Sequence, residues 1–176
     1  DGVVGSAQKQ PAPVYRALHW LQAFLQSPPP RVEHTQFAGR HVLLPDGYWN
    51  PDEKNCGVGA VLLREGSSPF SFGGMVPDHL SHQLLSMQEQ DVPKAQRNTQ
   101  AELLAVLMSI IMWHQDLQGA SLLVITDSKV EWANCDKGSA KDQQSRDLVS
   151  LLLFFCMIYR IHIWFQWVPS DQNPGD

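Results

Sequence analysis

Apolar segments of two kinds alternate along this chain, and their order limits the folds that it can adopt. Short apolar runs between turn residues are typical of strands, whereas apolar residues repeated every three to four positions are typical of a helix. Strand-like segments cover 41–44, 57–63 and 70–76, and a helix-like segment covers 100–117. We expect the first strands to pair antiparallel and the helix to cover them.

The second half of the chain repeats the alternation. Residues 122–126 form a short β-branched run that ends in Asp-Ser, which indicates a buried strand followed by the start of a helix. A polar loop at 134–143, a long apolar helix at 144–158 and a last strand at 161–168 complete the pattern. The predicted order is three strands, helix, strand, two helices and strand, which is an α/β mixed sheet flanked by helices.

The helix at 100–117 has the clearest local signals. Its apolar positions recur at helical spacing, and Gly119 lies just beyond its end. Asn98 or Thr99 is the predicted N-cap residue.

The chain is long enough for one core with extensions, because it has 176 residues of which 43% are hydrophobic. We divide it into an N-terminal extension at 1–39, with an amphipathic helix followed by three prolines, and a folded domain at 40–176. Its first residue is Asp1 and no apolar leader is visible, so we expect a fragment or processed product of a polyprotein. The longest apolar run, at 151–165, is interrupted by Arg160 and His162 and predicts buried core rather than a membrane span.

Charge and cysteine content narrow the functions that fit. A net charge of -5 counts against a free-standing nucleic-acid binder, whose surface is usually basic. The basic and acidic residues between 129 and 147 balance one another, so we expect an ordinary solvated face there, with Glu131 and Asp142 among its acids. The three cysteines have no paired spacing, which fits a reducing, intracellular setting.

Four carboxylates lie where the chain changes direction. Asp46 ends the first strand, Glu102 opens the long helix, Asp127 ends the fourth strand and Asp176 follows the last strand. Acids that converge need cations to neutralise them, and hard oxygen ligands favour Mg²⁺ or Mn²⁺. Two such ions would suit hydrolysis of a phosphodiester. Taken singly, each acid also fits a turn, a helix terminus, an N-cap or a tail.

Five motifs in this order resemble the ribonuclease H family, and in particular the domains attached to reverse transcriptases of retroviruses, retrotransposons and hepatitis B-type viruses. The motifs are LPDG at 44–47, GVGA at 57–60, NTQAELLA at 98–105, ITDS at 125–128 and WVPSDQNPGD at 167–176. The resemblance covers about residues 40 to 176.

The resemblance implies a five-stranded sheet, three strands antiparallel and then two parallel, and hydrolysis of the RNA strand of RNA–DNA hybrids during reverse transcription. It makes Asp46, Glu102, Asp127 and Asp176 the catalytic ligands of two Mg²⁺ or Mn²⁺ ions. It also implies that five residues contact the hybrid: Gly47, Thr99, Gln100, Ser128 and Asn173. Helix capping and turn formation explain the presence of these residues equally well. The expected partners are the hybrid and the polymerase domain of the same polyprotein, within a cell, virion or ribonucleoprotein particle.

Several departures from the family pattern are visible. Pro45 in the first strand predicts a short or bulged strand. The family's mobile histidine loop before the last Asp and its basic protruding helix have no counterpart, so we expect the polymerase region to assist substrate binding. The segment 77–98 is an insertion with one or two helical turns, and its His79 and His82 are predicted on the surface.

Two further alternatives concern aromatic residues and overall function. Trp49, Trp132 and Trp164 could stack on sugars or bases, although core positions are the stronger expectation. A catalytically inactive scaffold module is the alternative function. Integrase-like relatives of the same fold end in Glu and match less well.

Overall fold

The computed structural model describes residues 39–84 and 92–173, which lie within one compact unit at 36–176. Its strands are β1 (Arg40–Asn50), β2 (Asn55–Arg64), β3 (Phe70–Met75), β4 (Ser121–Thr126) and β5 (His162–Trp167). Its helices are α2 (Asp78–Leu84), α3 (Lys94–Met112), α4 (His114–Leu117), α5 (Lys129–Lys137), α6 (Gln143–Tyr159) and the 3-10 turn η1 (Ser170–Gln172). The amphipathic helix predicted before residue 39 lies outside the described residues.

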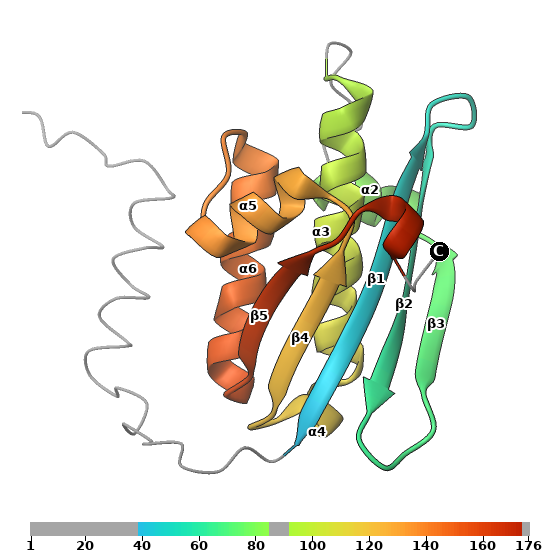
Figure 1. Ribbon diagram of the computed structural model, residues 1–176. Helices are drawn as coiled ribbons and strands as arrows, with labels where there is room; N and C mark the ends of the chain where they lie inside the picture. The colour runs from blue at the N-terminus through green and yellow to red at the C-terminus, as the bar shows by residue number, and fades with distance from the viewer. Residues whose placement is uncertain (1–38, 85–91, 174–176) are drawn as a thin grey trace, which may run out of the picture. The chain divides into compact units, whose positions relative to one another are not determined.

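The five strands form one mixed sheet in the order β3-β2-β1-β4-β5 (Figure 1). The pairs β1–β2 and β2–β3 are antiparallel, whereas β1–β4 and β4–β5 are parallel. This is the predicted sheet, with three antiparallel strands followed by two parallel ones. Most element bounds agree with the sequence pattern to within a few residues, and β1 and α3 are the exceptions.

Helices α3 and α6 lie on one side of this sheet, behind the strands as drawn in Figure 1, whereas the 3-10 turn η1 is drawn in front of them. Alternate strand residues point to the side of α3 and α6, and Leu43, Leu62 and Leu122 are completely buried there. Helix α3 supplies the opposing layer through Leu103 and Leu104. The core therefore lies between the sheet and α3 and α6. Among the described helices, none is long and apolar enough to cross a bilayer.

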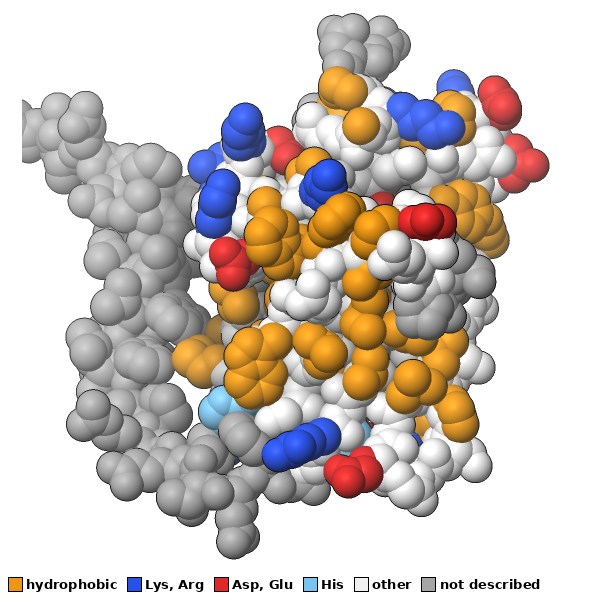
Figure 2. Space-filling view, viewed as in Figure 1, with side chains coloured by type: hydrophobic (Ala, Val, Ile, Leu, Met, Phe, Trp, Pro, Cys, Tyr) orange, Lys and Arg blue, Asp and Glu red, His pale blue; other side chains and the backbone are white. Residues whose placement is uncertain are grey.

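The opposite face of the sheet carries no described α-helix and is partly apolar (Figure 2). Strand alternation places exposed apolar side chains on it, among them Leu63, Leu123 and Trp164. The core prediction for tryptophans is therefore correct for Trp49, which is 4% exposed, and wrong for Trp164 and Trp132, at 52% and 38%.

Strand β1 is neither short nor bulged, so the prediction from Pro45 is wrong. It has 11 residues and pairs one-to-one with β2 from His41 to Asn50. Its pairing with β4 ends at Leu43↔Val124, before Pro45 is reached. The missing N–H of Pro45 therefore breaks no bond to β4.

Helix α3 begins earlier than predicted. Its N-cap is Pro93, so Asn98 and Thr99 lie inside the helix rather than at its start. The Asn98 Oδ1 instead accepts a hydrogen bond from the Trp49 backbone N–H, at 3.1 Å, and ties α3 to β1. Two residues before Trp49, Gly47 also faces α3. A Cβ added at Gly47 would lie 2.6 Å from the Glu102 backbone nitrogen, which is too close for a real contact.

We expect Gly47→Ala to lower the free energy of unfolding by about 1–3 kcal/mol, because α3 would have to move away from β1. Urea denaturation measures this loss. Gly73→Ala is the matched control, since a Cβ at Gly73 meets nothing within 4 Å. An equal loss in both variants would contradict the packing explanation.

Candidate active site

The sheet divides at the carboxyl end of its central strands. The β1–β4 ladder stops at Leu43↔Val124, whereas β4 and β5 stay paired as far as Thr126↔Trp167. Asp46 lies on β1 beyond the last β4 pair, and Asp127 directly follows β4. Asp46 therefore lies inside β1, four residues before its end, rather than at the strand end that the sequence predicted, and Asp127 lies across the split from it.

Glu102 approaches this split from the third turn of α3, not from the first turn as predicted, because the helix begins at Lys94. Its pKa is raised to about 7, chiefly by burial; a hydrogen bond from Ser128 lowers it, and the charges of Asp127 and Asp46 raise it further. Its Oε2 is buried and has no hydrogen-bond partner. The structure thus places Glu102 within the electrostatic influence of Asp127 and Asp46.

Asp127 is held by the chain that follows β5. Its Oδ2 accepts a hydrogen bond from the Ser170 hydroxyl at 2.6 Å, and its backbone carbonyl accepts one from Trp167 Nε1 at 2.9 Å. The Lys129 ammonium lies 4.4 Å from the centre of a Trp167 ring. These contacts fix the turn from η1 against the end of β4, at the same end of the sheet (Figure 1).

The fit of this site to divalent cations is partial. Carboxylate oxygens are the ligands that Mg²⁺ and Mn²⁺ prefer, and the buried Oε2 of Glu102 has no hydrogen-bond partner. Within residues 39–84 and 92–173, however, no three His, Cys, Asp or Glu side chains form a group that could hold a metal. Asp176, the fourth predicted ligand, lies outside the described residues.

The residues predicted to contact the hybrid have clear structural contacts. Gly47 is buried against α3, and Thr99 is buried with its hydroxyl donating to the Ala95 carbonyl. Gln100 is fully buried, and its Nε2 donates to Asp142 at 3.0 Å. These contacts agree with packing and capping.

Two more of the predicted residues belong to the turns that follow β4 and β5. Ser128 caps α5 by accepting the Glu131 N–H, and its side chain lowers the pKa of Glu102. Asn173 is 9% exposed, follows η1, and donates its backbone N–H to the Ser170 carbonyl at 3.1 Å.

Glu131 was not predicted as part of this region. The sequence suggested a solvated charge, but Glu131 is 0% exposed, and the pKa of its carboxyl is raised to about 8 by burial. The Thr126 hydroxyl donates to its Oε2. The one sequence signal was the Ser-x-x-Glu spacing at 128–131, which indicates a capped helix but not a buried acid. Asp142, taken for another solvated acid, caps α6 and is partly buried.

Two hollows flank the acidic residues. One, of about 500 Å³, is lined by Thr99 and Asp142 and by three lysines, Lys129, Lys137 and Lys141. The other, of about 270 Å³, lies beside Asp46 on the face of the sheet without described helices, where Gly59 and Gly73 pair across β2 and β3. The first offers positive charge, and the second offers space next to a carboxylate.

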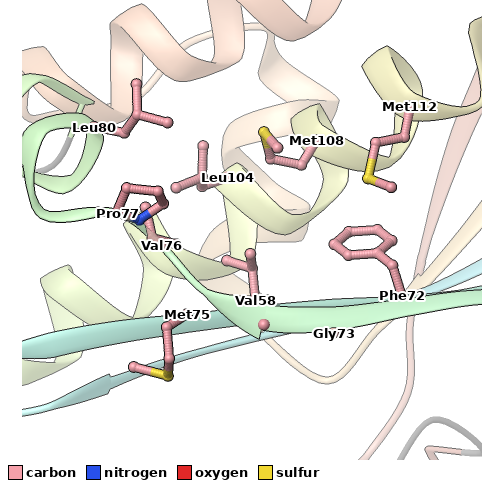
Figure 3. A pocket seen from close by; sticks show the side chains of 11 residues that line it. Val58, Phe72, Gly73, Met75, Val76, Pro77, Leu80, Leu104, Met108 and Met112 are labelled. Carbon is pink, nitrogen blue, oxygen red and sulfur yellow. The ribbon is translucent and has the colours of Figure 1, made fainter.

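A third pocket, of about 260 Å³, lies between β3, α2 and α3 (Figure 3). Its lining is apolar and includes Phe72, Leu80, Leu104, Met108 and Met112. His79 on α2 is exposed, as predicted, whereas the side chain of His82 lies outside the described residues.

No protein-family model and no curated protein sequence matches the chain. Solved structures do match. The N-terminal RNase H domain of Rv2228c from Mycobacterium tuberculosis is 18% identical, with 77% of this chain and 86% of that chain covered and a TM-score of 0.56. RNase H1 from Halobacterium salinarum is 14% identical, with 77% and 89% covered and a TM-score of 0.56.

A third match is LC11-RNase H1, isolated from compost, in complex with an RNA/DNA hybrid. It is 13% identical, with 76% of this chain and 88% of that chain covered and a TM-score of 0.54. These matches agree with the strand order and with the directions of pairing. The chain has the ribonuclease H fold.

Proposed function

We propose that this chain is a ribonuclease H domain that hydrolyses the RNA strand of RNA–DNA hybrids. The observation that carries the proposal is the electrostatic coupling of Glu102 to Asp127 and Asp46 at the split of the sheet. The three acids come from three separate segments of the chain. Because like charges repel, selection for stability alone would favour keeping them apart. The matched structures are RNase H proteins, one of them bound to an RNA/DNA hybrid, and this likeness supports the same reaction class.

Asp46, Glu102, Asp127 and Asp176 are the residues proposed to hold two Mg²⁺ or Mn²⁺ ions. When bound, such ions activate a water and stabilise the leaving oxygen of the phosphodiester. The chain's own groups orient the ligands: Ser128 donates to Glu102, and Ser170 donates to Asp127.

The lysine-lined hollow beside α5 supports binding of a polyanion. Lys129, Lys137 and Lys141 face a space that adjoins α3 one turn before Glu102, through Thr99. Such contacts attract phosphates without reading sequence. Because the whole chain has a net charge of -5, we expect this local attraction to be supplemented by a neighbouring polymerase domain. Such a partner would place the domain in reverse transcription, inside a cell or virion.

A catalytically inactive scaffold is the second candidate. One observation favours it, because the described acids do not by themselves form a metal-holding group. A scaffold of this kind would bind the hybrid or the polymerase without cleaving RNA, and the following assay separates the two functions.

We expect the protein to degrade the RNA strand of a labelled RNA–DNA hybrid when Mg²⁺ or Mn²⁺ is present, and Asp127→Asn to reduce the rate by about a thousandfold or more. Gel analysis of the labelled RNA measures both rates. Asp116→Asn is the matched control, because Asp116 lies on α4 and pairs with Arg64 at 2.9 Å, at the other end of the sheet (Figure 1). Equal rates for Asp127→Asn and wild type would contradict the assignment. No cleavage even with the polymerase region attached would favour the scaffold.

We also expect cation binding to depend on pH through Glu102. Its carboxyl is mainly neutral below its pKa of about 7, and a cation requires the ionised form. The affinity for Mn²⁺ should therefore fall by up to about tenfold for each pH unit below 7 and change little well above it. Isothermal titration calorimetry between about pH 5.5 and 8.5 measures this dependence. The Glu102→Gln variant should bind more weakly and with a flatter profile, and a wild-type affinity independent of pH would refute the prediction.

A further inference from the structure

Glu131 is a carboxylic acid in the core beneath the acidic site. It is 0% exposed, and its Oε1 is buried without a hydrogen-bond partner. A buried carboxyl group is costly unless its polar atoms are paired, and an apolar side chain of similar size would avoid that cost. Simple packing therefore does not explain why a glutamate occupies this position.

A closed chain of hydrogen bonds links Glu131 to the end of β4. The Thr126 hydroxyl donates to Glu131 Oε2 at 2.5 Å and accepts the Ser128 N–H at 3.1 Å. The Glu131 N–H in turn donates to the Ser128 Oγ at 3.2 Å. We call Thr126, Ser128 and Glu131 the β4 ring. Asp127 lies inside this ring in the sequence, so its backbone is held on both sides.

The β4 ring differs from an ordinary capping box. In that motif the glutamate at the third helical position returns to the backbone N–H of the capping residue. Here the Ser128 N–H goes to the Thr126 hydroxyl, and Glu131 binds that hydroxyl instead. The glutamate thus acts on Ser128 through Thr126, and Ser128 is the residue whose side chain lowers the pKa of Glu102.

We propose that Glu131 is a positioning residue, which accepts the Thr126 hydroxyl and so holds the Asp127–Ser128 turn in the geometry that serves Glu102 and Asp127. This inference rests on the proposed nuclease function. Burial raises the pKa of Glu131 to about 8, and a carboxyl that is largely neutral at pH 7 still accepts this hydrogen bond. The required property is an acceptor oxygen rather than a charge.

Three variants test this role in the whole chain. Glu131→Gln keeps an acceptor oxygen, whereas Glu131→Leu removes it and Thr126→Val removes the hydroxyl with little change of shape. We expect Glu131→Gln to retain at least half of the wild-type kcat on the hybrid. Glu131→Leu and Thr126→Val should each lose about tenfold or more in kcat with KM nearly unchanged. The double variant should be no worse than either single one, because both changes break the same ring.

Amide hydrogen exchange by NMR supplies a readout that does not depend on activity. The Ser128 amide should exchange about tenfold faster in Glu131→Leu and Thr126→Val, but not in Glu131→Gln. The Ser145 amide, held by Asp142 Oδ1 at 2.9 Å, is the internal control for a general loss of stability.

The outcomes separate the two proposals. A wild-type chain that never cleaves the hybrid contradicts the nuclease function itself. An active wild type with equally active Glu131→Leu, or with Glu131→Gln as damaged as Glu131→Leu, overturns the positioning role. Equal acceleration at Ser128 and Ser145 would also overturn it, because the loss would then be one of global stability.

Discussion

The close approach of α3 to β1 at Gly47 is the contact on which the candidate site depends. A side chain at this position would meet the backbone of Ala101 and Glu102, so only glycine allows the two elements to touch there. Asn98 fixes the rotation of the helix one turn earlier through the Trp49 N–H. Together these contacts determine the position from which the Glu102 side chain projects from α3. If the helix lay farther from the sheet, its carboxylate would no longer share an environment with Asp46 and Asp127.

The division of the sheet is the second requirement. If β1 and β4 stayed paired to their ends, the strands would close the space that Glu102 reaches, but their ladder stops at Leu43↔Val124. Pro45 follows within two residues and has no N–H with which to extend the ladder. Pro45 is therefore compatible with a long β1, because it lies beyond the part of β1 that pairs with β4.

The sequence predicted the sheet well because its information is local. Strand and helix periods, and the Asp-Ser that follows β4, are visible within a few residues of the chain. The acids Asp46, Glu102 and Asp127 were proposed in the same way, from the motifs around them and from expected places at element ends, although Asp46 lies inside β1 and Glu102 in the third turn of α3. The start of α3 was missed because Pro93 precedes a polar first turn, in which apolar periodicity gives no signal. Trp164 was misjudged because strand alternation alone does not reveal which face of a sheet lacks a helix.

Glu131 marks the limit of that local information. Basic and acidic residues balance one another along 129–147, and a glutamate among balancing charges is normally solvated. Its burial follows from the packing of α5 on the sheet, and its role follows from two hydrogen bonds that involve Thr126 and Ser128.

Net charge has the same limitation as a guide to function. A chain of net charge -5 still gathers Lys129, Lys137 and Lys141 around one hollow beside the acids. Phosphates respond to the local arrangement of charge within about a Debye length, roughly 8–10 Å, so the lysine hollow matters more to a polyanion than the sum over the chain.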